Sequence, residues 1–152
     1  MKNALTRRGF ALATAATATL FATAPHAFAE ALTLTDIAGR EVTLPDTPSR
    51  IILGEGRMMY AIAPLATEDP FERIVGWKDD LILYDPDAFR RFEAAFPDDT
   101  ARMVNFGNPY AGDFSIEAVL ENEADLLLLD LGNLFKAEET GLIEKLDKAG
   151  VA

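Results

Sequence analysis

Polar and aromatic residues that follow short apolar runs are the best candidates for binding a ligand. An arginine and a lysine among them can meet an anionic group, and tryptophan and tyrosine rings can stack on a flat one. The candidate ligand-binding residues are Arg57, Met58, Tyr60, Trp77, Lys78, Tyr110 and Asn133. The same segments also contain Glu55, Asp79, Asn108, Pro109 and Gly132. This mixture suits a large polar ligand.

Ordinary structural roles compete with ligand binding at three of these positions. Trp77 suits half-buried packing, Met58 suits a hydrophobic core, and Lys78 suits a solvated surface. Both explanations stay open at this point.

Several kinds of chemistry are excluded by what the chain lacks. It has no cysteine among its 152 residues, which rules out disulfides, thiolate metal sites, cysteine nucleophiles and a lipid-modified cysteine. There is no Gly-x-Ser-x-Gly motif, and the pair Gly54 and Gly56 lacks the third glycine of a dinucleotide-binding loop. We therefore expect a protein that is not an enzyme.

The charge of the chain disfavours two classes of partner. Asp and Glu outnumber Lys and Arg by 25 to 14, which gives a formal net charge of -11. Nonspecific binding to nucleic acid or to anionic lipid is opposed by this charge. The acidic pairs at 79–80 and 98–99 lack the spacing of a calcium-binding loop, so we expect both pairs in solvated loops.

Residues 1–29 have the pattern of a cleavable export signal. Arg7 and Arg8 lie in a segment that resembles the twin-arginine motif, and a short alanine-rich apolar stretch follows at 11–24. Ala27 and Ala29 give the small-x-small pattern that signal peptidase requires. We expect cleavage after Ala29 and a periplasmic protein, exported by the twin-arginine route or by the Sec route.

Cleavage at this place changes the chemistry open to the mature chain, residues 30–152. It removes His26, the only histidine, and three basic residues, so the formal charge changes from -11 to -14. A chain without histidine or cysteine has little means of building a zinc or haem site by itself. We expect no intrinsic cofactor or metal, and any iron that the protein handles should arrive as a chelate.

The mature chain alternates short apolar runs with amphipathic segments. The pattern predicts a hairpin of two strands at 32–35 and 41–44. It predicts further strands at 50–53, 74–76, 102–104 and 126–129, and helices at about 58–65, at 85–96, from 115 onward and at 135–149. Such alternation is typical of an α/β fold with a parallel sheet. Val151 and Ala152 look like the approach to a further strand, which suggests a fragment of a longer protein.

The parallel sheet predicts where the candidate residues should meet. Ligands bind beyond the carboxyl ends of the strands in open parallel sheets. The loops after four strands should therefore converge at one edge and bring the candidate side chains together.

Several segments of the chain resemble the siderophore- and cobalamin-type periplasmic binding proteins of ABC importers. The opening Thr-Asp-Ile-Ala-Gly-Arg-Glu-Val-Thr-Leu-Pro at 35–45, with Pro-Ser-Arg-Ile-Ile at 48–52, is similar to the opening of that family. The segments 115–128 and 142–151 resemble two of its helix-to-strand units, with Ala124 in place of the usual proline. Residues 54–65 depart from the family's usual first helix.

The resemblance implies that residues 30–152 form the N-terminal, Rossmann-like lobe of a two-lobed binding protein whose second lobe is missing. The ligand of such a protein lies between the lobes. The resemblance also implies capture of a ferric siderophore and its delivery to an ABC permease, with Glu117 as the permease contact and the protein as a monomer. Cobalamin or haem is an alternative ligand, and an exported cofactor-dependent redox enzyme is an alternative function.

Overall fold

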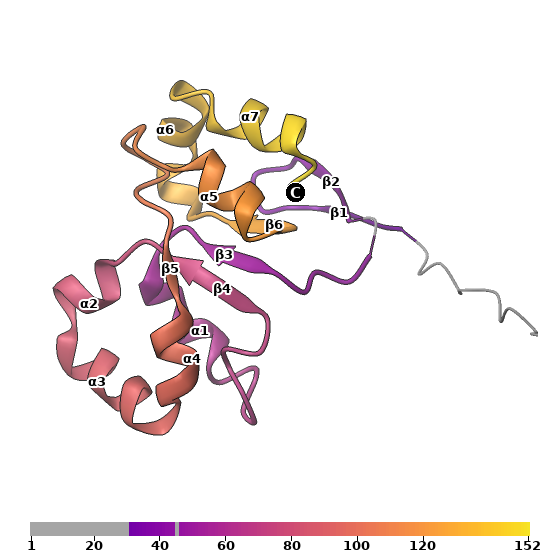
Figure 1. The fold of residues 1–152 in the computed structure, drawn as a ribbon. Helices are drawn as coiled ribbons and strands as arrows, with labels where there is room; N and C mark the ends of the chain where they lie inside the picture. The colour runs from indigo at the N-terminus through magenta and orange to yellow at the C-terminus, as the bar shows by residue number, and fades with distance from the viewer. Residues whose placement is uncertain (1–30, 45) are drawn as a thin grey trace, which may run out of the picture.

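A computed structural model of the chain describes residues 31–44 and 46–152. The export signal predicted at 1–29 lies outside these residues, including Arg7, Arg8, Ala27 and Ala29. The described part has one parallel sheet with helices on both sides and a separate antiparallel hairpin (Figure 1). The predicted α/β class is confirmed.

Five of the six predicted strands form where they were predicted, and the sixth is displaced: the strand predicted at 102–104 begins only at Val104, because Arg102 ends the helix α4 Pro97–Arg102. The strands are β1 Leu32–Thr35, β2 Glu41–Leu44, β3 Ile51–Leu53, β4 Ile74–Trp77, β5 Val104–Asn105 and β6 Leu126–Leu128. The first two strands pair as the antiparallel hairpin, and the other four form a parallel sheet in the order β5-β4-β3-β6. The carboxyl ends of these four strands therefore lie at one edge.

The hairpin is held together by its turn. One oxygen of the Asp36 carboxylate accepts hydrogen bonds from the backbone N–H groups of Ala38 and Arg40, each at 2.9 Å. Its other oxygen accepts from Arg40 Nε at 2.7 Å. These bonds lower the pKa of Asp36. An aspartate that bonds its own turn in this way favours the reversal of the chain.

The helices are short. They are the 3-10 helices η1 Gly56–Met58 and η2 Leu131–Asn133, and the α-helices α1 Met59–Ile62, α2 Asp80–Tyr84, α3 Pro86–Ala95, α4 Pro97–Arg102, α5 Ile116–Glu121, α6 Leu134–Glu139 and α7 Leu142–Ala149. Within the described residues, no helix is long and apolar enough to cross a membrane.

Two hydrophobic cores lie on the two faces of the sheet. Ile52 belongs to the core under α5, α6 and α7, whereas Leu53 belongs to the core under α1 to α4. Successive residues of a strand point to opposite faces, so these neighbours in β3 anchor different cores. Figure 1 shows the two groups of helices on opposite sides of the sheet.

Two helix predictions need correction, and α4 was not predicted. The helix predicted at 85–96 forms as α3, which ends at Ala95, and α4 follows with Pro97 at its first position, where a missing N–H costs nothing. The helix predicted at 135–149 is two helices, because Gly141 adopts a left-handed backbone with φ 67° between them. The helix predicted at 58–65 ends early, at Ile62.

The two acidic pairs are a further correction, because both lie at the start of helices instead of in loops. Asp98 and Asp99 lie in the first turn of α4, and the pair at 79–80 begins α2, where Asp80 is completely buried.

Candidate ligand-binding site

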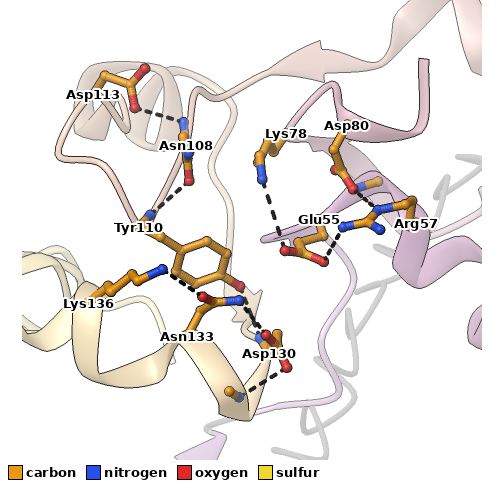
Figure 2. A network of polar contacts seen from close by, with 12 residues as sticks. Glu55, Arg57, Lys78, Asp80, Asn108, Tyr110, Asp113, Asp130, Asn133 and Lys136 are labelled. Atoms are coloured by element: carbon orange, nitrogen blue, oxygen red, sulfur yellow. Dashed lines mark hydrogen bonds and ion pairs between the residues drawn. The ribbon is translucent and has the colours of Figure 1, made fainter. Parts of the chain in front are cut away.

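Side chains from four loops meet at the carboxyl edge of the parallel sheet, as the strand pattern predicts. Figure 2 shows them facing one another across the space between the loops. The residues are Glu55 and Arg57 after β3, Lys78 and Asp80 after β4, Asn108 and Tyr110 after β5, and Asp130, Asn133 and Lys136 after β6.

One half of the site is a pair of linked ion pairs. Arg57 Nε donates to Asp80 Oδ2 at 2.5 Å, and Arg57 Nη2 donates to Glu55 Oε2 at 3.3 Å. Asp80 also accepts from the backbone N–H of Gly56 at 2.6 Å. The bond to Asp80 raises the pKa of Arg57, so the guanidinium stays charged. Asp80 thus fixes both the loop after β3 and its arginine.

Lys78 joins this half of the site to the other. Its ammonium nitrogen lies 4.0 Å from Glu55 Oε1 and 5.8 Å from the centre of the Tyr110 ring. Only 19% of its side chain is exposed, so the charge is partly desolvated. A partly buried lysine between a carboxylate and an aromatic face is held in position better than a surface lysine. The sequence left open whether Lys78 binds a ligand or lies on a solvated surface, and its partial burial speaks against the solvated surface.

Tyr110 lies half-buried at the centre of the site. Its hydroxyl accepts a hydrogen bond from the backbone N–H of Asp130 at 3.0 Å. Burial raises its pKa to about 12, so the phenol is neutral at physiological pH and keeps its proton as a donor.

Gly54 makes the close approach of these loops possible. A Cβ at this position would lie 2.8 Å from the Leu128 carbonyl oxygen and 3.0 Å from the Tyr110 hydroxyl. Only glycine lets the end of β3 pass this close to the end of β6. The small residue is thus needed by the site as well as by the sheet.

The second half of the site is a chain of hydrogen bonds after β6. Asp130 Oδ1 accepts from Gly132 N at 3.1 Å, and Asp130 Oδ2 accepts from Asn133 Nδ2 at 2.6 Å. Asn133 Oδ1 in turn accepts from Lys136 Nζ at 3.1 Å. The predicted candidate Asn133 thus belongs to a network whose other side chains, those of Asp130 and Lys136, the prediction did not include.

The site has no excess of positive charge. Figure 2 draws the cations Arg57, Lys78 and Lys136 together with the carboxylates of Glu55, Asp80, Asp113 and Asp130. The two cations that the sequence assigns to an anionic ligand already have carboxylate neighbours in the structure. Recognition here would depend on hydrogen bonds and aromatic faces at least as much as on net positive charge.

Trp77 lies in the core instead of at the edge. Its side chain is 2% exposed, and its ring packs edge-on against Phe71 and Phe89 at centroid distances of 5.9 and 6.5 Å. As the last residue of β4, it points to the face that α1 to α4 cover. The structure thus corrects the prediction that its ring faces a ligand.

Met58 and Tyr60 lie at the border of the site. Met58 is partly buried and packs against the core that contains Trp77. Tyr60 is 47% exposed, and its hydroxyl donates to Asp85 Oδ2 at 2.6 Å, which raises the pKa of Tyr60 and lowers that of Asp85. The exposed Tyr60 ring keeps a face that a ligand can reach.

Sequence reasoning missed Tyr84 beside this border. The residue is 73% exposed, and its ring centre lies 5.7 Å from the Arg57 guanidinium carbon. The apolar and aromatic run at 81–84, directly after the acidic pair, is the sequence signal that would have drawn attention to it. Tyr84, Tyr60 and Arg57 give the site an aromatic and cationic rim.

The described residues give no sign of a metal site. Within 31–44 and 46–152, no group of three or more histidine, cysteine, aspartate or glutamate residues could hold a metal ion.

Glu117 lies in the first turn of α5 and is exposed, with its carboxylate 3.4 Å from the hydroxyl of the capping residue Ser115. A macromolecular partner can reach it there.

A solved structure shares the fold of this chain. The TroA-like periplasmic binding protein FepB from Veillonella parvula aligns with a TM-score of 0.68 and 28% sequence identity over 78% of this chain. The chain has the fold of a TroA-like binding protein. The resemblance stated from the sequence is thereby confirmed. The part of this TroA-like chain that aligns covers about 34% of the length of FepB. No family model and no curated protein sequence matches the chain.

Proposed function

We propose that this TroA-like chain forms one wall of a periplasmic binding site that captures a ferric siderophore for an ABC importer. The proposal rests mainly on one observation. Polar side chains from four loops gather at the carboxyl edge of the sheet, in a fold shared with a periplasmic binding protein. This edge is where open parallel sheets bind ligands.

The chemistry of the site supports a large polar ligand. Arg57 and Lys78 supply charged donors, and the neutral Tyr110 phenol supplies a further donor between them. The exposed rings of Tyr60 and Tyr84 offer flat surfaces at the rim. A ferric siderophore presents oxygen acceptors and flat chelating groups, which match these features. The protein would bind this chelate without transforming it.

The test is calorimetric titration of the purified chain with ferric catecholate and ferric hydroxamate chelates, cobalamin and haemin. Saturable binding of one ferric chelate, absent for the iron-free chelator, is the expected result. Saturable binding of cobalamin or haemin alone would identify that compound as the ligand in place of a ferric siderophore. Turnover of an electron donor would favour a redox enzyme instead.

A pair of lysine variants connects binding to the site. Lys78→Ala should weaken binding of the chelate about tenfold, or about 1.4 kcal/mol, because it removes a partly desolvated charge beside Tyr110. Lys148→Ala is the matched control, since that side chain is 71% exposed on α7. Equal affinities of the two variants would contradict the assignment of this edge as the ligand site.

Delivery to the importer is tested separately at Glu117. Glu117→Ala in the exported protein should reduce uptake of the chelate and leave its binding unchanged, because the side chain is exposed on α5 and does not belong to the network of the site. Glu144→Ala on α7 is the matched control, with a side chain that is 74% exposed. Unchanged uptake of the chelate by the Glu117→Ala variant would contradict the proposal that Glu117 contacts the permease.

A further inference from the structure

A partly exposed carboxylate lies between the two cations that the sequence assigns to an anionic ligand. Glu55 Oε2 accepts a hydrogen bond from Arg57 Nη2 at 3.3 Å, and Glu55 Oε1 lies 4.0 Å from Lys78 Nζ. Figure 2 shows Glu55 in this place, linked to both side chains. Each oxygen of the carboxylate thus faces one cation, which is the position that an anionic group of a ligand would otherwise take.

The neighbouring carboxylate, that of Asp80, has a different role. Asp80 is completely buried, and its bonds to the Gly56 N–H and to Arg57 hold the loop after β3 in place. The side chains of Glu55 and Arg57, in contrast, are 17% and 44% exposed. In this half of the site, Glu55 is therefore the carboxylate that a ligand can meet.

The other half of the site adds negative charge as well. Asp113 is exposed after β5, and Asp130 is partly exposed after β6. The whole chain carries a formal charge of -11, which acts in the same direction. A ligand with several negative charges would be repelled by these groups, because the Coulomb energy grows with the product of the charges.

We propose that Glu55 is a specificity-determining residue, which neutralises Arg57 and Lys78 so that this edge accepts an uncharged ferric chelate and discriminates against a polyanionic one. This inference rests on the proposed function and names the class of chelate. Three hydroxamates balance the charge of a ferric ion, whereas three catecholates leave a trianion. The expected ligand is thus a ferric trihydroxamate.

Hydrogen-bond donors remain available for an uncharged chelate. A guanidinium has five N–H donors, and the bonds of Arg57 to Asp80 and Glu55 use two of them. The oxygen atoms of a trihydroxamate accept hydrogen bonds without carrying net charge. Glu55 therefore removes the attraction for polyanions and leaves the site able to bind neutral acceptors.

The test compares two chelates by calorimetric titration of the purified chain: ferrichrome, a neutral ferric trihydroxamate, and ferric enterobactin, a trianionic ferric tricatecholate. The unaltered chain should bind ferrichrome at least about tenfold more tightly. Glu55→Gln keeps the size of the side chain and removes its charge. It should strengthen binding of ferric enterobactin about tenfold and change binding of ferrichrome by less than about threefold, because only the charged chelate interacts with the lost charge at long range.

Glu144→Gln is the matched control. It changes the net charge of the chain by the same amount, in a side chain that is 74% exposed and pairs with Lys148 on α7. It should leave the affinity for both chelates unchanged. An equal gain for ferric enterobactin in this control would assign the discrimination to overall charge and overturn the proposal.

Three other results would also overturn it. They are tighter binding of ferric enterobactin than of ferrichrome by the unaltered chain, no gain for ferric enterobactin in Glu55→Gln, and weaker binding of both chelates by that variant. The last result would make Glu55 a support of the site instead of a determinant of specificity. If neither the unaltered chain nor the variants bound any ferric chelate, the proposed function itself would fail, and this inference with it.

Discussion

Asp80 connects the stability of the chain to the geometry of its ligand site. Among the described residues it is the only charged side chain that is buried, and it bonds both the Gly56 N–H and Arg57. Buried charges are tolerated when they are paired and hydrogen-bonded in this way. The local sequence does not reveal this role, because the partners lie more than twenty residues earlier in the chain.

Replacing Asp80 tests this connection. Asp80→Asn keeps an acceptor for Gly56 but removes the charge that holds Arg57, so we expect a loss of about 1–3 kcal/mol in the free energy of unfolding. Urea denaturation measures the loss. Asp87→Asn, at an exposed ion pair with Arg90, should change the free energy by less than about 0.5 kcal/mol. Similar losses in the two variants would contradict a special role for the buried carboxylate.

Tyr110 should give the protein a dependence on alkaline pH. Its pKa is raised to about 12 in the folded chain, while an unfolded tyrosine ionises near its ordinary value of about 10. Between these values the unfolded state loses a proton that the folded state keeps, so stability falls as the pH rises. Tyr110→Phe should flatten this fall between about pH 10 and 12 in urea denaturation. An identical pH dependence in the variant would show that other groups cause it.

At the scale of the elements, the sequence predicts the strands better than the helices. The hairpin, β3, β4 and β6 lie where period-two and apolar runs place them, whereas β5 begins two residues later than predicted. The helix at 135–149 was predicted as one piece because its apolar stripe continues through Gly141, and only the left-handed backbone of that glycine breaks it. Trp77 was misplaced because the strand was predicted to end at 76, whereas β4 includes Trp77 and turns its ring into the core under α1 to α4.

The convergence of the loops was predictable, but the network within them was not. The rule for parallel sheets brings Arg57, Lys78, Tyr110 and Asn133 to one edge, and the structure agrees. The bonds of Asp80 and Asp130 depend on contacts between loops far apart in sequence. A periodic pattern along one segment carries no information on such contacts.

Gly54 tests how tightly the elements must approach one another. Gly54→Ala would place a Cβ against the backbone oxygen of Leu128, which cannot move without shifting β6 away from β3. We expect a loss of about 1–3 kcal/mol in unfolding free energy and weaker ligand binding. Gly132→Ala is the matched control, because its Cβ would meet the Asp130 carboxylate at an ordinary 3.4 Å. Equal stability of the two variants would show that the strand ends tolerate the added methyl group.

At the scale of the whole molecule, two cores share one thin sheet. The core under α5 to α7 and the core under α1 to α4 lie on the two faces of strands that are two to four residues long. Ile52 and Leu53 are neighbours in β3 and are both fully buried, one in each core. A disturbance of either core is therefore transmitted to the other by the backbone of β3.

This shared strand predicts that the described chain unfolds as one unit. Ile52→Ala removes a fully buried side chain from the α5–α7 core and should cost about 2–5 kcal/mol. Trp77, the only tryptophan of the chain, reports on the opposite core. In urea denaturation of the variant, tryptophan fluorescence and far-ultraviolet circular dichroism should shift together to the same lower midpoint. A fluorescence midpoint that stays at the value of the unaltered chain would mean that the α1–α4 side unfolds independently, so that the sheet joins the cores without coupling them.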